Sequence, residues 1–250
     1  MLRRIAIILL SALAGALLAG CGKGQHVPAR AGTATRTSSA PGGVSPPTLT
    51  RAQALAFAHA VNLTAADVPG LHAVAKREHH SASGRQAELT LARCVGLSGS
   101  GQVAEAASPN FVRAVGIAHF DVSSNVTVSQ SAALAAHELA QLRAVRAKGC
   151  LKRYLAVLLN SSLSNATVGP VSVQEGTPPT AGAGGSLGLR ISTSITVRSI
   201  PIPFYLDILG FVSGASQVSL MSTGVPVPFP AATEQRLFLA LLARAKAHHP

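Results

Sequence analysis

The feature that most restricts the fold of this chain is an alternation of apolar and polar side chains over residues 187–198. The apolar members are Leu187, Leu189, Ile191, Ile195 and Val197, and the polar members are Arg190, Ser192, Ser194, Thr196 and Arg198. Because successive side chains of a strand point to opposite faces, the pattern predicts a long β-strand that is half buried and has one wet face.

The residues after this strand predict an antiparallel meander. Residues 202–212 are nearly all apolar and indicate a central strand, in which Pro203 restricts pairing to the part that follows it. Ser213-Gly214-Ala215-Ser216 predicts a hairpin turn, and residues 217–221 supply the returning strand. Residues 225–230 hold three prolines and are therefore excluded from the sheet interior.

A helix is expected to close the chain over residues 231–247. Its exposed side carries Arg236, Arg244 and Lys246. Its buried stripe consists of Leu237, Phe238, Leu241, Leu242 and Ala245.

Earlier segments supply further helices and one strand. A short helix is expected over residues 52–61, and a longer one over residues 131–148 that Gly149 breaks. Residues 151–159 carry an apolar helical stripe, and residues 124–129 alternate like a strand. Residues 72–86 indicate a polar loop, and residues 88–97 fit either a helix or a strand. The order of elements predicts an α+β domain over residues 49–250, an antiparallel β-sheet flanked by helices.

Residues 1–20 have the pattern of a secretory signal peptide. Arg3 and Arg4 precede an apolar run over residues 5–18, which is shorter than the roughly 20 residues of a membrane span. The ending Leu18-Ala19-Gly20-Cys21 resembles the bacterial lipobox. That resemblance implies a diacylglyceryl thioether on Cys21 and cleavage before it; the alternative is an ordinary signal peptide with an incidental Cys.

Residues 21–48 are rich in Gly, Ser, Thr, Pro and Ala and predict a flexible linker. Such a composition buries too little apolar surface to offset its ordering entropy. A coil of this length reaches on the order of 30 Å. The expected location is therefore the extracytoplasmic face of the cell membrane, with the domain held there by the lipid on Cys21.

The net charge of the chain restricts the class of partner that it is expected to bind. Removal of Arg3 and Arg4 lowers the formal net charge from +12 to +10. A basic surface attracts anionic headgroups or wall polymers, whereas the low aromatic content of 4% offers little stacking for nucleic acid. An explanation of at least equal weight is that scattered, solvated arginines reflect a GC-rich genome.

Two cysteines remain once Cys21 is assigned to lipid. In an exported domain, Cys94 and Cys150 predict a disulfide. The alternative is a reactive thiol or a metal-binding pair, but neither residue lies in a C-x-x-C motif. We therefore favour the structural bridge.

The sequence predicts no catalytic residue, no metal ligand and no cofactor. His137-Glu138 lacks the second His of a zinc helix, because Gln141 occupies that position. Gly96 to Ser100 misses the last Gly of a nucleophile elbow, and His79-His80 and His248-His249 are expected to be solvated. Asp207, inside an apolar strand, is expected to be exposed or paired with an Arg.

A wider resemblance rests on four features: the lipobox, the position of Cys94, the turn Ser108-Pro109-Asn110-Phe111, and the helix start Cys150-Leu151. Together with the closing hairpin and helix, they resemble actinobacterial exported lipoproteins. The domain is similar to PsbP-like domains or to the extracytoplasmic sensor domains of Ser/Thr kinases. The resemblance implies an antiparallel sheet flanked by helices and transfers no ligand residue.

Three functions stay open at this level. The first is a non-enzymatic envelope lipoprotein that binds a lipid, a wall polymer or an envelope protein, like a sensor. The second is an exported enzyme, which His119 or His137 close to Asp121 or Asp207 in a cleft would favour. The third is a structural spacer. The ligand-binding residues are unknown from the sequence.

Overall fold

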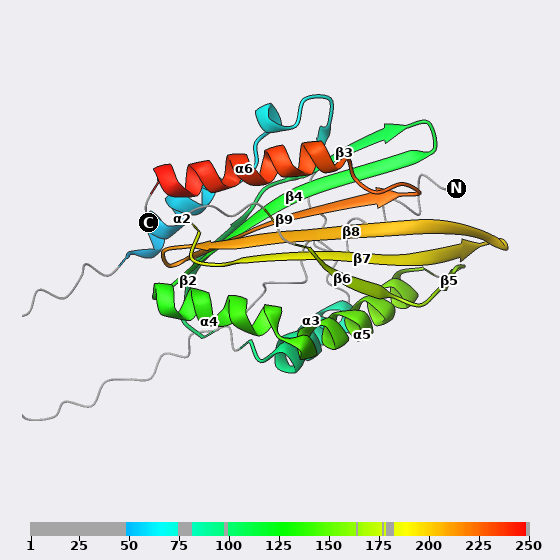
Figure 1. Cartoon of the computed structure of the whole chain (residues 1–250), viewed down its shortest axis with the longest axis horizontal. Helices are drawn as coiled ribbons and strands as arrows, with labels where there is room; N and C mark the ends of the chain where they lie inside the picture. The colour runs from blue at the N-terminus through cyan, green and yellow to red at the C-terminus, as the bar shows by residue number, and fades with distance from the viewer. Residues whose placement is uncertain are drawn as a thin grey trace, which may run out of the picture.

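The computed structural model describes residues 49–74, 82–97, 100–163, 165–176, 178 and 183–248. These residues form one α+β domain, in which a nine-stranded antiparallel sheet carries helices on both faces (Figure 1). The predicted fold class is thereby confirmed. The predicted signal peptide, Cys21 and the linker lie outside the described residues.

The helical elements are α2 (Arg51–Val61), the 3-10 turn η1 (Ala65–Asp67), α3 (Ala82–Val95), α4 (Ala132–Arg143), α5 (Val145–Ser162) and α6 (Ala231–Ala247). The strands are β1 (His72–Val74), β2 (Gln102–Ala107), β3 (Asn110–Val115), β4 (Ala118–Ser129), β5 (Thr167–Val168), β6 (Ser172–Gly176), β7 (Ser186–Val197), β8 (Ile200–Ser213) and β9 (Ser216–Val225).

The sheet has the strand order β1-β3-β4-β9-β8-β7-β5, with β2 added on β4 and β6 added on β7. The segment of alternating apolar and polar residues forms β7, which pairs with β8 along its whole length. The predicted hairpin joins β8 to β9, where Ser213 lies opposite Ser216. Gly214 in that turn has a φ of 56°, a backbone conformation that favours glycine.

Pro203 does not restrict pairing as predicted. Strand β8 pairs with β7 from Ile200 onwards, and Pro203 lies opposite Ser194. Pairing with β9 begins only at Tyr205, so Pro203 sits where β8 extends beyond β9. A proline is tolerated in such an edge position, because one side of the strand needs no ladder hydrogen bond.

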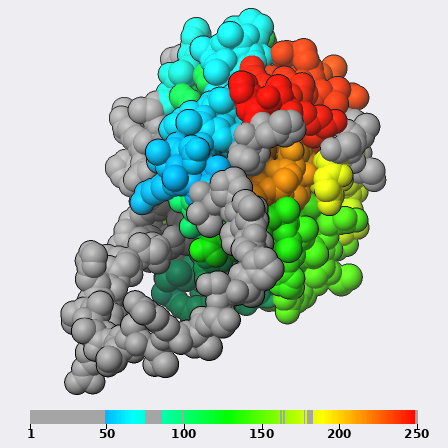
Figure 2. All heavy atoms as spheres, turned by 90° about the vertical axis from the view of Figure 1, so that its left-hand side faces the viewer, coloured from blue at the N-terminus to red at the C-terminus, as the bar shows by residue number. Residues whose placement is uncertain are grey.

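The sheet separates two hydrophobic clusters. Phe211 and Leu209 of β8 point to the face covered by α2 and α6, whereas Ile208 and Val212 point to the face covered by α4 and α5. Seen from the end of the sheet, α2 (blue) and α6 (red) lie together on one side of the β8–β9 hairpin (orange), and α4 (green) lies on the other (Figure 2). The central strands are therefore buried on both faces.

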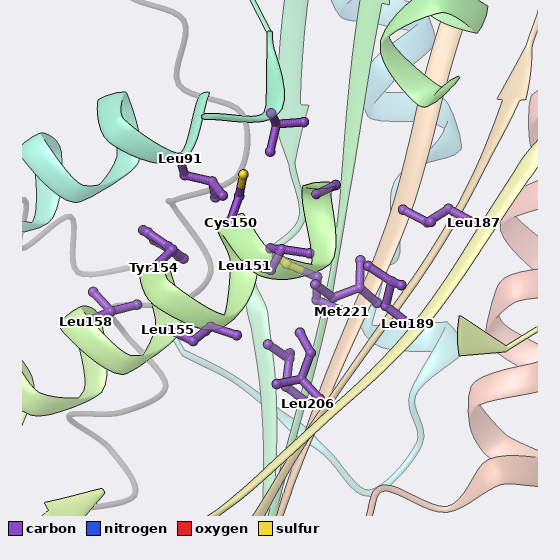
Figure 3. Close-up of a cluster of buried hydrophobic side chains, with 14 of the residues drawn as sticks. Leu91, Cys150, Leu151, Tyr154, Leu155, Leu158, Leu187, Leu189, Leu206 and Met221 are labelled. Carbon is purple, nitrogen blue, oxygen red and sulfur yellow. The ribbon is translucent and has the colours of Figure 1, made fainter. Parts of the chain in front are cut away.

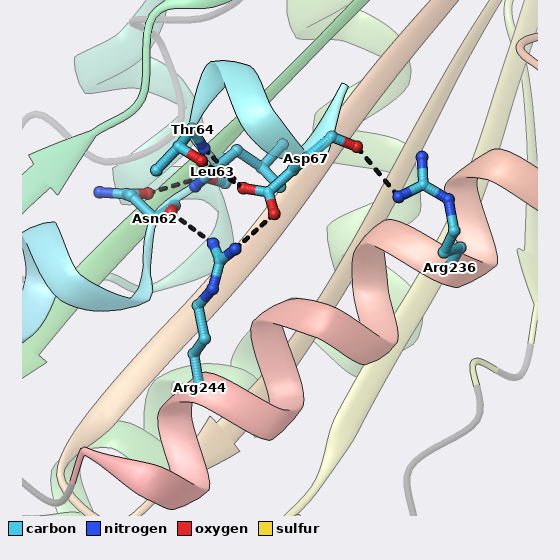
Figure 4. A network of polar contacts seen from close by, with 7 residues as sticks. Asn62, Leu63, Thr64, Asp67, Arg236 and Arg244 are labelled. Atoms are coloured by element: carbon cyan, nitrogen blue, oxygen red, sulfur yellow. Dashed lines mark hydrogen bonds and ion pairs between the residues drawn. The ribbon is translucent and has the colours of Figure 1, made fainter. Parts of the chain in front are cut away.

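Helix α6 has the predicted bounds and the predicted buried stripe. The ring of Phe238 meets that of Phe211 edge-on, with centroids 5.4 Å apart. Arg244, however, is half-buried rather than fully solvated. It forms an ion pair with Asp67 and donates to the carbonyl oxygen of Asn62 at 2.9 Å (Figure 4). The prediction failed because η1 places a carboxylate over the helix, which no local pattern indicates.

The predicted helix over residues 131–148 is broken five residues earlier than expected. Ala144, with a ψ of 145°, separates α4 from α5, and Gly149 lies inside α5. The break lets Leu139 of α4 and Leu151 of α5 enter the same cluster. This packing outweighs the cost of about 1 kcal/mol for a glycine inside a helix.

Helix α3 replaces part of the predicted polar loop and resolves the ambiguous segment. It presents Leu91 and Val95, one turn apart, to α5, while Gln86, Thr90 and Arg93 are exposed. The short strand β1 takes up the start of the same loop, and residues 75–81 lie outside the described part. The sequence of α3 holds too few apolar residues to show a helical period.

The predicted disulfide between Cys94 and Cys150 is present, with the two Cα atoms 5.8 Å apart. It joins the end of α3 to α5, next to the buried side chains of Leu91, Leu151 and Tyr154 (Figure 3). Within the described residues, no helix is long and apolar enough to cross a membrane.

We expect the Cys94→Ala/Cys150→Ala double variant to lose about 4 kcal/mol of unfolding free energy, because a bridge across 56 residues restricts the unfolded chain. Urea unfolding followed by circular dichroism measures the loss. The reduced wild-type chain should unfold at the same midpoint as the double variant. A loss below about 1 kcal/mol would contradict a stabilising role.

Candidate functional site

An apolar cavity of about 60 Å³ lies between the α4–α5 layer and the β7–β8–β9 part of the sheet. It is partly enclosed, and Leu151 of α5 faces Leu187 and Leu189 of β7 across this region (Figure 3). Leu139 and Leu142 of α4 complete its roof. The other lining residues are Ile208, Gly210, Phe211, Gln217, Val218 and Ser219.

The hollow lies over a row of the sheet in which two of the three positions carry small residues. In this row, Leu187, Gly210 and Ser219 lie opposite one another on β7, β8 and β9. A Cβ atom at position 210 would have its nearest neighbours at 3.5 Å (the Val218 carbonyl oxygen) and 3.9 Å (Leu187 Cβ), which are ordinary contacts. Gly210 therefore leaves space that a larger side chain would fill.

A polar rim borders the cavity on the β9 side. The side-chain amide of Gln217 donates to a carboxylate oxygen of Glu138 on α4. On the neighbouring strand β4, Asn125 and Thr127 lie opposite Ser219 and Gln217, and both are buried. These residues continue the rim away from the hollow.

Two carboxylates give this rim its charge. Asn125 donates to Glu105 of β2 at 3.0 Å, and Gln102 donates to the other oxygen of Glu105 at 2.9 Å. Burial raises the pKa of Glu138, and the hydrogen bond from Gln217 opposes that rise. The rim thus combines amides, hydroxyls and carboxylates beside an apolar hollow, an arrangement that suits a ligand with an apolar end and a hydrogen-bonding end.

Asp207 lies on the opposite face of the sheet, under α6. Its carboxylate accepts two hydrogen bonds from Arg190, from Nε at 2.7 Å and from Nη2 at 2.8 Å, so the predicted pairing with an Arg is confirmed. Ser222 lies opposite Asp207 on β9 and donates to Glu234 of α6. Because both oxygens of Asp207 accept hydrogen bonds from one guanidinium, we interpret this ion pair as structural.

Glu234 of α6 lies close to this row, and its pKa is raised. Burial is the main cause that raises its pKa, and the charge of nearby Asp207 adds to the rise. The hydrogen bond from Ser222 and the charge of Arg190 act in the opposite direction. Glu234 also lies in the first turn of α6, where a negative charge favours the helix dipole.

The histidines and carboxylates considered for an enzyme do not line the cavity. His137 is exposed on α4 and contacts Gln141 of the same helix at 3.4 Å. His119 and Asp121 share one face of β4, outside the cavity lining, while Asp207 faces the other way. Among the described residues, no three His, Cys, Asp or Glu side chains are placed to hold a metal ion.

The cavity residues were not identified from the sequence. The available signal was Gly210, a glycine inside an otherwise apolar strand, which marks a position where something approaches closely. The helical roof gave no signal, because it depends on the break at Ala144.

Comparisons with known proteins assign no function to this chain. No family model, no curated protein and no solved structure matches the chain.

We expect the variant Glu234→Gln to be more stable than the wild-type chain at pH 8, with the difference disappearing towards pH 4. A raised pKa means that the folded state binds the proton more tightly than the unfolded chain. Stability therefore falls as pH rises above the ordinary value of 4.5 and through the folded-state pKa. The amide keeps an acceptor for Ser222 but carries no charge.

Thermal unfolding at a series of pH values measures this difference. Glu175→Gln, which removes a carboxylate from an exposed position on β6, is the matched control and should show no comparable gain at pH 8. Equal melting temperatures of Glu234→Gln and wild type at pH 8 would contradict the expectation.

Proposed function

We propose that this protein is a non-enzymatic lipoprotein of the cell envelope whose domain binds a small ligand with an apolar end. A diacylglyceryl group on Cys21 holds the chain on the extracytoplasmic face of the membrane, and residues 21–48 link the anchor to the domain. The observation that supports binding is the apolar cavity over Gly210, which is bordered by polar side chains.

The chemistry of the cavity restricts the ligand. Leucines from α4, α5 and β7 offer only dispersion and hydrophobic contacts, so the part that enters is apolar and narrow. The carboxylates of Glu138 and Glu105 disfavour an anion at the rim, because like charges repel. The polar end of the ligand therefore carries hydroxyl, amide or cationic groups that donate to these acceptors.

The anchor is supported by the sequence at residues 18–21 and by the charged and apolar segments before it. One acyl chain binds a bilayer only marginally, whereas two chains anchor a protein stably. A diacylglyceryl group on Cys21 therefore suffices to hold the domain.

We expect the mature chain, purified from a bacterial membrane, to yield a tryptic peptide Cys21–Lys23 with the mass of a diacylglyceryl group added. The variant Cys21→Ala should lack this mass, whereas Cys94→Ser should retain it, because the lipid is on Cys21 alone. Mass spectrometry of the N-terminal peptide measures this. An unmodified Cys21 in the wild type would contradict the anchor.

We expect native mass spectrometry of the membrane-purified chain to show an added mass that leaves on denaturation. Gly210→Val should lower the ligand-bound fraction at least tenfold, because the branched side chain occupies the cavity. Gly176→Val is the matched control: its Cβ meets nothing within 4 Å, and it should retain the ligand. A bare mass in the wild type would favour a spacer, and equal occupancy in Gly210→Val would place the ligand elsewhere.

A further inference from the structure

Helix α5 begins within the most basic stretch of the chain. Residues 143–153 contain five Lys or Arg residues and no acidic residue. Positive charges in the first turns of a helix oppose its dipole, which prefers anions there. Local helix stability therefore does not account for this stretch.

The fold uses some of these charges internally. Arg146 donates to the carbonyl oxygen of Val95 at 2.8 Å and so caps the end of α3. Lys148 pairs with Glu175 at 2.8 Å. Arg153 lies 3.0 Å from the sulfur of Cys94. Lys152 and Arg93 are exposed, and no ion pair or hydrogen bond holds either of them within the part of the chain that the structure describes.

The same surface also exposes aliphatic side chains. Val145 is 83% exposed and Val157 is 56% exposed. At 100° per residue, Val145, Lys152, Arg153 and Val157 fall within about 140° of the α5 circumference. Leu89 of α3, 43% exposed, lies on the helix that the disulfide joins to α5.

We propose that this face, defined by Arg93 of α3 and by Val145, Lys152, Arg153 and Val157 of α5, docks on an anionic phospholipid bilayer. Basic side chains attract anionic headgroups, and aliphatic side chains beside them enter the boundary between headgroups and acyl chains. The buried ring of Tyr154 leaves no aromatic side chain in this set for stacking on nucleic acid bases.

The linker permits this contact. Fully extended, 28 residues span about 90 Å, so the anchored domain can turn any of its faces to the membrane. The biological setting rests on the proposed anchor at Cys21, but the docking face is testable without it. The chain from residue 21 with Cys21→Ser carries no lipid, so a failure to dock would leave the anchor untouched.

The test is co-sedimentation of this Cys21→Ser chain with vesicles of phosphatidylcholine containing 30% phosphatidylglycerol. We expect binding that weakens as NaCl rises from 50 to 500 mM, and no binding to phosphatidylcholine alone. Arg93→Glu/Lys152→Glu should weaken binding at least tenfold. The matched control Arg51→Glu/Arg113→Glu reverses two exposed charges on α2 and β3 and should bind like the parent.

A second measurement avoids the charge-reversed variants. A fluorophore on Val157→Cys should shift to the blue when anionic vesicles are added, whereas one on Ile117→Cys, 77% exposed on the β3–β4 turn, should not. Equal weakening by both double variants would overturn the proposal in favour of general charge attraction. Absence of binding and of the spectral shift would overturn it in favour of a partner other than lipid.

Discussion

The register of the β7–β8–β9 ladder is the constraint on which the rest of the structure depends. Strand β8 is buried on both faces, so a slip by one residue would exchange the side chains that meet α6 with those that meet α5. The hairpin at Ser213 and Ser216 fixes this register at one end. With the register fixed, Arg190, Asp207 and Ser222 share one row, and Leu187, Gly210 and Ser219 share another on the opposite face.

These two rows differ in the polarity of the side chains that they bury. The first row buries charged groups. Both carboxylate oxygens of Asp207 accept hydrogen bonds from the guanidinium of Arg190, whereas Glu234 of α6 has a raised pKa. In the second row Gly210 and Ser219 are small, and a hollow remains beside Leu187 that the helical roof only partly fills. The buried charges therefore lie on the α6 face, and the hollow lies on the α4–α5 face.

The elements that depend on a local sequence pattern could be predicted from the sequence. Strand β7 followed from its alternation, α6 from its apolar stripe, and the Cys94–Cys150 bridge from the export signal and an even cysteine count. The break at Ala144 could not be predicted, because it is set by how α4 and α5 meet the sheet. The ion pair of Arg244 with Asp67 joins residues far apart in the sequence. The cavity lies on the other face of the sheet and depends on the break at Ala144, which is why only Gly210 indicated it in the sequence.

Helix α5 connects the two proposals physically. Leu151 and Lys152 are neighbours in the chain, so their side chains diverge by about 100° around the helix. Leu151 lines the cavity, whereas Lys152 belongs to the outer face. The disulfide at Cys150 links this turn of α5 to α3, so the α5 part of the cavity lining and the docking face belong to one covalently linked pair of helices. A bilayer that holds the outer face would therefore also restrain Leu151, the residue that α5 contributes to the cavity lining.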